Sequence, residues 1–397
     1  MNISQQECCG CGLCVAICPL KCITMQADAE GFFFPHIEED KCINCGLCQK
    51  SCPVNLNAGK PLPSTAGDHC IYAVSADAAQ VKNASSGGVF PALAQSFLLR
   101  GGGVVGAAFN QQFDVELKLI EDSALLPALM QAKYVQASVP PQLFQQAVNL
   151  LQNGRPLLFT GTPCQVAAFR SFCGKRNYPD LLCAEIICHG VPSPAVWRSY
   201  LSFVTQNFKE PVSAVYFRDK STGWHKFSLR IDCGKEKFIQ THKESPYMQL
   251  FLDELISRKS CGNCAFKGAL SSADLSLGDF WKLKKIAPSM DNSTGVSMVI
   301  AHTEAGMAAL KKCSWASWHE FPMTCVKISN RAYMESVPPN PSRKEFFARF
   351  IAEKQKWFAP TGYFQKKRRR KLLGKIADFL CSKCCLSRIF PRKNSKN

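Results

Sequence analysis

The feature that most constrains this chain is a cysteine motif near its start that occurs twice. Its two copies are Cys8-x2-Cys11-x2-Cys14-x3-Cys18-Pro19 and Cys42-x2-Cys45-x2-Cys48-x3-Cys52-Pro53. Two residues between successive cysteines form a tight loop that directs three thiolates towards one compact group. The fourth cysteine, which precedes a proline, leaves this loop and points elsewhere. The repeat therefore predicts two iron–sulfur clusters near the start of the chain.

The fourth cysteine of each copy decides how the ligands are shared. In two-cluster ferredoxins this cysteine ligates the other cluster, so that the two halves interlock. One [4Fe–4S] cluster is accordingly assigned to Cys8, Cys11, Cys14 and Cys52, and the second to Cys42, Cys45, Cys48 and Cys18. Segments 23–25 and 31–35 predict two short strands that cover the clusters. Residues 1–56 thus resemble a bacterial-type two-cluster ferredoxin over their whole length.

A zinc site is the alternative interpretation of this motif, because paired Cys-x2-Cys units also occur in four-cysteine zinc sites. Such sites use two pairs separated by a longer spacer. They do not require three evenly spaced cysteines followed by a fourth cysteine and a proline. The repeat therefore favours iron–sulfur clusters over zinc. Cys9 and Cys22 fall outside the spacing, and we interpret both as small buried hydrophobic residues rather than ligands.

The length and composition of the chain extend this interpretation. A chain of 397 residues exceeds what a ferredoxin needs and predicts further domains. Its hydrophobic content of 46% and charged content of 20% are ordinary for a soluble globular protein. The 23 cysteines are also compatible with a disulfide framework in a secreted protein. Because their spacings match cluster ligation and no export signal precedes them, we expect a cytoplasmic protein instead.

The net charge of +18 is unevenly distributed. Residues 1–56 carry a balance of −3 and residues 366–397 a balance of +11, which leaves +10 for the middle of the chain. Because much of the excess lies in the tail, we expect no nucleic-acid partner for the core. A mildly basic core suits anionic cofactors and substrates.

The basic tail combines its charge with apolar residues at helical spacing between 372 and 380. Such a segment predicts peripheral contact with an anionic membrane surface. For a cytoplasmic protein, this surface is the inner face of the membrane. A solvated basic tail is the alternative. The cysteines of the tail, Cys381, Cys384 and Cys385, stay unassigned.

A segment rich in Pro, Gly, Ala and Ser separates the ferredoxin-like region from the rest of the chain. It lacks apolar periodicity and is predicted to be a linker. The predicted fold class is α+β / α/β, with a ferredoxin domain followed by a mixed α/β flavin-binding domain. The parts are a ferredoxin domain at 1–56, a linker at 57–68, an α/β domain at 69–355 (with parts at about 69–155 and 156–335), and a tail at 356–397.

A loop of small residues, Ser85-Ser86-Gly87-Gly88, precedes a stretch with helical spacing at 89–99. Such a loop lets backbone N–H groups approach a phosphate, and the helix dipole favours the anion. Taken by itself, the motif favours a plain helix cap and turn over a phosphate site.

Units of strand, loop and helix follow and predict an α/β layer with sites at the strand ends. A buried strand at 155–159 leads to Cys164, and a strand at 181–187 leads to Cys188. An antiparallel meander is predicted at 212–242. Further strands are predicted at 70–74, 102–109, 115–120, 276–281 and 296–302, and helices at 142–152, 193–206, 246–258, 304–312 and 343–355.

A second group of cysteines lies in this part of the chain. The pair Cys261-x2-Cys264 needs two more ligands to complete a site. Cys164 and Cys188, each on a loop at a strand end, are the best candidates. The spacing leaves open a third [4Fe–4S] cluster, a zinc site, or cysteines without a metal.

Six short motifs then stand in a recognisable order after the ferredoxin-like region. They are SSGGVF at 85–90, KYVQ at 133–136, GTPCQVA at 161–167, ICHGVPSP at 187–194, CGNCAFK at 261–267 and LGDFW at 277–281. Across residues 1–320, the chain resembles the coenzyme F420 hydrogenase/dehydrogenase beta-subunit family, in the bacterial form with a fused N-terminal ferredoxin.

This resemblance implies a core that binds FAD beside an iron–sulfur cluster. It implies that the flavin is lined by Ser85, Ser86, Gly87, Gly88, Lys133, Tyr134 and Thr162. It also implies a third [4Fe–4S] cluster held by Cys164, Cys188, Cys261 and Cys264. His189 is a candidate proton donor at the flavin, with a hydrogen bond to the cluster region as its alternative role.

We therefore expect an iron–sulfur flavoprotein oxidoreductase. It would exchange electrons with a redox partner protein or reduced ferredoxin, and with a deazaflavin coenzyme or another small-molecule substrate. Clusters carry single electrons, and a flavin converts them into a hydride equivalent. The alternatives are an electron-transfer subunit of a larger redox complex, a reductase of cell-surface polysaccharide biosynthesis, and a zinc-stabilised binding module.

Overall fold

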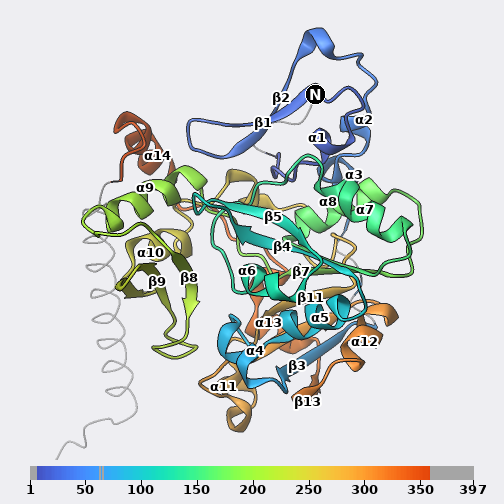
Figure 1. The fold of residues 1–397 in the computed structure, drawn as a ribbon, viewed down its shortest axis with the longest axis vertical. Coiled ribbons are helices and arrows are strands. Elements are labelled where there is room, and N and C mark those ends of the chain that lie inside the picture. Colours follow the sequence, from blue (N-terminus) through green and yellow to red (C-terminus); the bar gives the residue numbers. More distant parts are fainter. Residues whose placement is uncertain (1–6, 62–63, 65–66, 358–397) are drawn as a thin grey trace, which may run out of the picture. The chain divides into compact units, whose positions relative to one another are not determined.

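A mixed β-sheet forms the centre of the fold in the computed structural model, which describes residues 7–61, 64 and 67–357 (Figure 1). Its strands are β3 (His69–Ser75), β4 (Gly103–Phe109), β5 (Val115–Ile120), β6 (Leu157–Gly161), β7 (Leu181–Ile186), β11 (Leu275–Asp279), β12 (Ser297–Ala301) and β13 (Trp315–Phe321). They lie in the order β13-β3-β12-β11-β7-β6-β4-β5. The described residues up to Gln355 form one compact unit around this sheet.

Four neighbouring strands of the sheet, β4, β6, β7 and β11, run parallel to one another. On one side β5 pairs antiparallel with β4, and on the other β12, β3 and β13 add antiparallel pairs. The carboxyl ends of the four parallel strands share one edge of the sheet, called the carboxyl edge below. Loops at such an edge are where open α/β sheets commonly place their binding sites.

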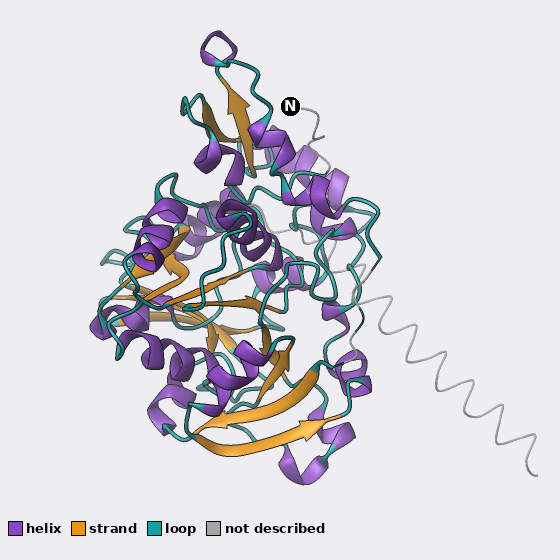
Figure 2. Ribbon diagram, turned by 90° about the vertical axis from the view of Figure 1, so that its right-hand side faces the viewer, coloured by secondary structure: helices purple, strands orange, loops and turns teal. Residues whose placement is uncertain are grey.

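Helices cover both faces of the central sheet (Figure 2). The helices that follow the N-terminal region are α4 (Ala78–Asn83), α5 (Val89–Leu98), α6 (Leu126–Leu129), α7 (Leu143–Gln152), α8 (Pro163–Cys173), α9 (Pro194–Thr205), α10 (Pro246–Leu252), α11 (Leu283–Ile286), α12 (Glu304–Lys311), α13 (Thr324–Ser329) and α14 (Arg343–Ala352), of which α4 to α8 and α12 pack on this sheet. Leu158 of β6 joins a hydrophobic cluster with residues of α5, including Leu93. The next residue, Phe159, stacks on Phe169 of α8 at 4.1 Å. Because successive strand residues point to opposite faces, α5 and α8 lie on opposite faces of the sheet.

The meander predicted at 212–242 is confirmed as a separate three-stranded sheet. Its strands are β8 (Ala214–Asp219), β9 (Ser228–Cys233) and β10 (Glu236–Thr241), paired antiparallel in the order β10-β9-β8. The helix predicted at 246–258 is shorter than expected, because α10 ends at Leu252. Glu254 has a left-handed backbone with φ of 57°, which a continuing helix does not allow. The chain then turns towards the cysteine pair at 261 and 264.

The N-terminal region, residues 7–56, contains the predicted hairpin. Strands β1 (Ile23–Ala27) and β2 (Phe33–Ile37) pair antiparallel, with short helices α1 (Leu13–Ile17), α2 (Leu47–Lys50) and α3 (Pro53–Asn57) beside them. The hairpin packs against the rest of the compact unit through buried charges. Arg343 of α14 donates to both carboxylate oxygens of Glu30 at 3.2 and 2.5 Å.

Short 3₁₀ helices complete the described structure. They are η1 (Glu39–Lys41), η2 (Ser123–Leu125), η3 (Lys259–Asn263), η4 (Pro288–Met290) and η5 (Arg331–Tyr333). No helix within the described ranges is both long and apolar enough to cross a membrane. The membrane contact predicted for the basic tail, and its three cysteines, lie outside the described residues.

Candidate functional site

Four predicted ligands of the first cluster line one hollow in the N-terminal region. They are Cys8, Cys11, Cys14 and Cys52, called the inner thiol set. Met25, Pro35 and Val54 line the same hollow, and Cys48 also reaches it. Burial, together with the charge of neighbouring thiols such as Cys8, raises the pKa of Cys14 to about 12. Such crowded thiols become thiolates readily only beside positive charge, which a bound metal provides.

A glycine fixes the inner thiol set against the rest of the molecule. Gly10 lies between Cys9 and Cys11 and has a left-handed backbone with φ of 71°. A side chain at this position would collide with Gln136 and approach Arg258 Nη1 at 3.2 Å. The ligand loop therefore sits directly on residues of the α/β part, and the glycine permits both the turn and the close approach.

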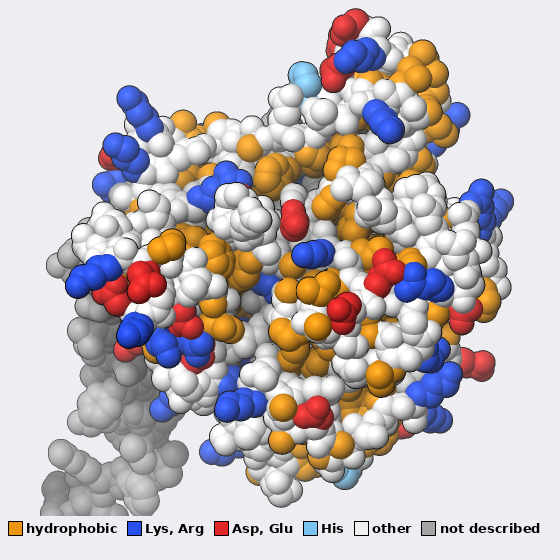
Figure 3. Space-filling view, viewed as in Figure 1, with side chains coloured by type: hydrophobic (Ala, Val, Ile, Leu, Met, Phe, Trp, Pro, Cys, Tyr) orange, Lys and Arg blue, Asp and Glu red, His pale blue; other side chains and the backbone are white. Residues whose placement is uncertain are grey.

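The predicted ligands of the second cluster have more exposed surroundings. They are Cys18, Cys42, Cys45 and Cys48, called the outer thiol set. The Cys45 side chain is exposed, and the neighbouring Ile43 and Leu47 are 66% and 41% exposed. Hydrophobic side chains are visible at the upper end of the molecule, which residues 7–56 form (Figure 3). The outer thiol set therefore faces solvent more than the inner set does.

The remaining predicted ligands converge at the carboxyl edge of the central sheet. Cys164, Cys188, Cys261 and Cys264 form what we call the edge thiol set. Cys164 lies in the first turn of α8, Cys188 follows β7, and the other two lie in or directly after η3. Burial, together with the charge of neighbouring thiols that include Cys164, raises the pKa of Cys261 to about 12 and that of Cys264 to about 11. Burial likewise raises the pKa of Cys188, with added effects from the other three thiols.

The position of Cys164 follows from the local sequence. Thr162 and Gln165 form a capping box at the start of α8, and Pro163 occupies the first helical position. A capping box and an N-terminal proline are strong signals for a helix start. They place Cys164 at the sheet edge, where its Sγ lies 3.2 Å from the Thr162 hydroxyl.

Cys9 connects the inner and the edge thiol sets. Its thiol lies close enough to Cys11 of the inner set and to Cys164 of the edge set for the thiols to shift one another's pKa. Cys11 also feels the charge of Cys164. The sequence predicted only a small buried residue at Cys9 and did not predict its place between two groups of ligands. The two sets are therefore direct neighbours, although Cys164 lies 112 positions after Cys52, the inner ligand nearest to it in sequence.

Arg258 holds the same junction together. Its side chain is 2% exposed. Its Nε donates to the Cys8 carbonyl at 2.8 Å, and its Nη1 donates to Gln136 Oε1 at 3.3 Å. The guanidinium also lies 4.0 Å from the centre of the Phe34 ring. A buried cation thus fixes the inner ligand loop to the segment that precedes η3.

The thiol sets are not arranged around a single ion. Within residues 7–61, 64 and 67–357, no group of three or more His, Cys, Asp or Glu side chains is disposed to hold one metal ion.

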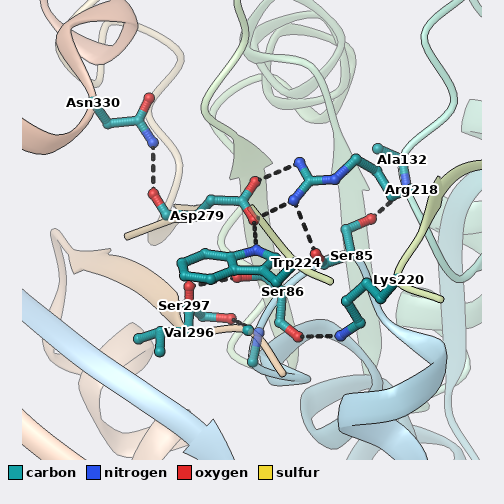
Figure 4. Close-up of polar contacts among 12 residues, drawn as sticks. Ser85, Ser86, Ala132, Arg218, Lys220, Trp224, Asp279, Val296, Ser297 and Asn330 are labelled. Atoms are coloured by element: carbon teal, nitrogen blue, oxygen red, sulfur yellow. Dashed lines mark hydrogen bonds and ion pairs between the residues drawn. The ribbon is translucent and has the colours of Figure 1, made fainter. Parts of the chain in front are cut away.

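The loop at 85–88, which the family resemblance predicts to line a flavin, is held by the polar contacts shown in Figure 4. Ser85 Oγ accepts from the Ala132 N–H at 2.7 Å, and the Gly87 N–H donates to Ser297 Oγ at 2.9 Å. A side chain at Gly87 would collide with the Ala73 carbonyl. Gly87 is therefore required for packing against the sheet, whatever the loop binds.

A buried ion pair lies against this loop. Arg218 of β8 donates to both carboxylate oxygens of Asp279, at 2.9 and 2.8 Å, and to the Ser85 carbonyl at 3.1 Å (Figure 4). Asp279 also accepts from the Trp224 indole N–H at 2.8 Å. Lys220 donates to the Ser86 carbonyl at 3.1 Å. The central sheet, the meander and the loop thus meet in one network.

Lys133 and Tyr134 lie beside the same network. Arg218 Nη1 donates to the Tyr134 hydroxyl at 3.2 Å. Burial lowers the pKa of Lys133 to about 7. The Lys133 ammonium donates to the Met130 carbonyl at 2.8 Å. Among the described residues, Gln131 Oε1 and Arg218 Nε are buried polar atoms without a hydrogen-bond partner.

His189, the candidate proton donor, lies next to the edge thiol set and forms a close ion-pair contact with Glu254. The Glu254 side chain is 5% exposed and that of His189 is 34% exposed. A buried carboxylate in this position orients the imidazole. The structure thus brings His189 to the carboxyl edge, and its role there stays a prediction.

Two family models match the chain. Residues 7–56 match the 4Fe–4S dicluster domain, and residues 154–322 match the C terminus of the coenzyme F420 hydrogenase/dehydrogenase beta subunit. Over residues 154–322, the chain thus resembles the coenzyme F420 hydrogenase/dehydrogenase beta-subunit family. It is therefore an iron–sulfur electron-transfer redox protein related to this beta subunit. The family named from the six motifs is confirmed.

Comparisons with individual proteins add little to the family assignment. No curated protein matches the chain. Among solved structures, it is similar to a chain of the F420-reducing [NiFe] hydrogenase complex from Methanosarcina barkeri, with 17% sequence identity. The match covers 72% of this chain and 89% of that chain, with a TM-score of 0.44. This TM-score is too low to support an argument about a site.

Several residues of the beta-subunit-like part were not predicted as site residues. Arg218 and Lys220 contact the loop at 85–88 from the meander, and Arg258 contacts the inner ligand loop. Asp279 lies within the LGDFW motif, but this motif does not indicate that Asp279 pairs with Arg218. Nothing in the sequence near Arg218 indicates that it pairs with a carboxylate 61 positions away.

Proposed function

We propose that this protein is an iron–sulfur flavoprotein oxidoreductase that passes electrons from its clusters to a flavin. A deazaflavin coenzyme or another organic substrate would then accept them. The observation that carries the proposal is the contact of Cys9 with Cys11 and Cys164. It joins the inner and edge thiol sets at the edge where the predicted flavin residue Thr162 also lies. An electron path needs such an uninterrupted series of neighbouring sites.

The thiol chemistry supports cluster ligation by all three sets. The inner and outer sets would each hold one [4Fe–4S] cluster within the dicluster domain. The edge set would hold a third, because four buried thiols from three separate segments converge there. Burying four thiols together is favourable mainly when a metal group takes up their negative charge. Zinc at the edge set is the competing assignment.

The network around Arg218 supports the binding of a polar cofactor such as FAD. Gln131 Oε1 and Arg218 Nε are buried without hydrogen-bond partners, and a polar molecule bound beside them would supply partners. Burial lowers the pKa of Lys133 to about 7, so that the amine is only partly protonated near neutral pH, and a cofactor phosphate beside it would favour the charged form. Gly88 begins α5 without a side-chain cap, which leaves backbone N–H groups available to an anion.

When bound, the clusters would carry single electrons, and FAD would convert them into a hydride equivalent. Residues of the chain would position the ligands and the proton donor around these groups. Arg258 fixes the inner loop against the edge set, and the Thr162 hydroxyl orients Cys164. The contact between His189 and Glu254 can hold a proton near the carboxyl edge.

The exposed outer thiol set is the proposed contact site for a redox partner protein or a reduced ferredoxin. Cys45 is exposed, with Ile43 and Leu47 beside it. Exposed apolar side chains next to a redox centre suit a brief encounter, since small interfaces release their partner quickly. Electrons would thus enter at the outer set and leave through the flavin.

Cofactor analysis of the anaerobically purified full chain tests this function. We expect about twelve irons, about twelve labile sulfides and one FAD per chain. The double variant C261A/C264A should lose about four irons and keep FAD. The matched control C173A/C233A, which removes two buried cysteines outside the three sets, should keep all of them. Eight irons with one zinc would refute the third cluster, and a full chain without flavin would refute the flavoprotein assignment.

A further inference from the structure

Cys22 occupies an unexpected position beside the outer thiol set. The sequence predicts a small buried residue here, and the side chain is indeed 2% exposed. Its Sγ, however, lies 3.4 Å from the Sγ of Cys18. The side chain of Cys42 lies near this thiol as well. Cys18 and Cys42 are two of the four predicted ligands of the second cluster, so this site has a fifth thiol.

The backbone fixes Cys22 in this position. The Lys21 N–H donates to the Cys18 carbonyl at 3.2 Å, and Lys21 has a left-handed backbone with φ of 51°. The chain therefore turns back on itself directly after Cys18. The Cys22 carbonyl then accepts from the Glu38 N–H at 2.9 Å, at the open end of the β1–β2 hairpin. The turn at Lys21 and the pairing with Glu38 thus direct the Cys22 thiol towards Cys18.

The equivalent position in the other half of the repeat is different. Counting four residues from Cys52 leads to Leu56, which is 46% exposed. The inner thiol set therefore has no matching thiol four residues after its proline-linked ligand. This asymmetry coincides with the difference in exposure. The outer set, with the exposed Cys45, is the one more accessible to oxidants that remove cluster ligands.

We propose that Cys22 is a reserve ligand of the second cluster, able to replace Cys18. This inference rests on the assignment of residues 7–56 as a dicluster domain. In the exchange, the bond from iron to the Cys18 sulfur breaks and a bond from iron to the Cys22 sulfur forms. The proton of the Cys22 thiol passes to Cys18, across the 3.4 Å contact. The step consumes no oxidant or reductant and leaves the total charge unchanged.

Iron analysis of full-chain variants tests the proposal. C18A should keep nearly the iron content of the wild type, whereas C18A/C22A should lose about four irons per chain. C22A alone should keep its iron. C18A/C173A is the matched control, since Cys173 lies at the end of α8 outside the three sets, and it should behave like C18A. C45A gives the reference for loss of the second cluster.

A loss of iron in C18A as large as that in C45A would overturn the proposal. If C45A itself loses no iron, the dicluster assignment fails instead, so the two failures are distinguishable. Alkylation provides a second readout that also serves the milder variant C18S. In iron-loaded C18A or C18S, Cys22 should resist iodoacetamide until a chelator removes the iron. Alkylation of Cys22 in the loaded variant, with iron retained, would show that it is not a ligand.

Discussion

The inner and outer halves of the dicluster domain come from motifs of the same spacing but lie in different surroundings. The inner thiol set is packed on the α/β part through Gly10, Arg258 and Cys9. The outer set lies beside exposed apolar residues such as Ile43. The cysteine motif thus determines that a cluster is bound, and the surroundings of each thiol set determine the electron-transfer partner of that cluster. The inner half is suited to internal transfer and the outer half to a partner.

The largest expected effect comes from Cys52, the ligand that crosses between the halves. C52A should lose about four irons, and the loss should fall on the inner cluster although Cys52 belongs to the second motif. Electron paramagnetic resonance of the reduced protein separates the two clusters. C45A should remove the outer signal and leave the inner one. Loss of the outer signal in C52A would contradict the interlocked assignment.

The next effect concerns the junction of the inner and edge sets. R258M should weaken the packing of residues 7–56 by about 2–4 kcal/mol, because it leaves the Cys8 carbonyl without its buried donor and removes one of the two donors to Gln136 Oε1, the other being the Phe33 N–H. Hydrogen exchange should accelerate in the N-terminal region, with little change in the central sheet. R198M, which removes an exposed arginine paired with Asp114, is the control. Unchanged exchange in R258M would mean that other contacts hold the junction.

A pH effect is expected at the flavin end of the path. Burial lowers the pKa of Lys133 to about 7, so the protein without flavin holds an ammonium below this pH and a neutral amine above it. If the ammonium contacts a cofactor anion, FAD affinity should fall as the pH rises from 6 to 8.5, by up to about tenfold per unit above the pKa. K133M should bind FAD more weakly and without this slope. Titration of the flavin-free protein by fluorescence measures both, and equal slopes in the two proteins would exclude Lys133.

The smallest effect is expected at the outer surface. I43D places a charge beside the exposed outer set and should slow reduction by a partner ferredoxin about two- to tenfold. Iron content and reduction by dithionite should stay unchanged, because Ile43 is not a ligand. I239D, at an exposed position of β10, is the matched control. Equal slowing in both variants would remove the argument for a partner site at Ile43.

Much of this architecture was predictable because local patterns determine it. The hairpin and the meander depend on neighbours in sequence, and the structure confirms both. The helix expected at 246–258 was too long, because its apolar pattern continues past Asp253 while the backbone at Glu254 turns left-handed. Strand β13 was missed because it is a largely exposed edge strand, and only its pairing with β3 identifies it.

The contacts between distant residues were not predictable. Cys9 falls outside the ligand spacing, and its role depends on Cys164, which is brought to it by the fold. Cys22 likewise looks like a small core residue until the turn at Lys21 directs it to Cys18. Spacing identifies residues that bind one group from one loop. It contains no information on which groups then become neighbours.

The central claim is that electrons pass from the dicluster domain through the edge thiol set to the flavin. Rapid mixing of the flavin-loaded protein with a reduced ferredoxin tests it most directly, with flavin absorbance as the readout. C261A/C264A should slow flavin reduction by on the order of tenfold or more relative to wild type and to C173A/C233A. Reduction of its flavin by a small chemical reductant should be far less affected. Flavin reduction by ferredoxin at the wild-type rate in C261A/C264A would contradict the proposed path.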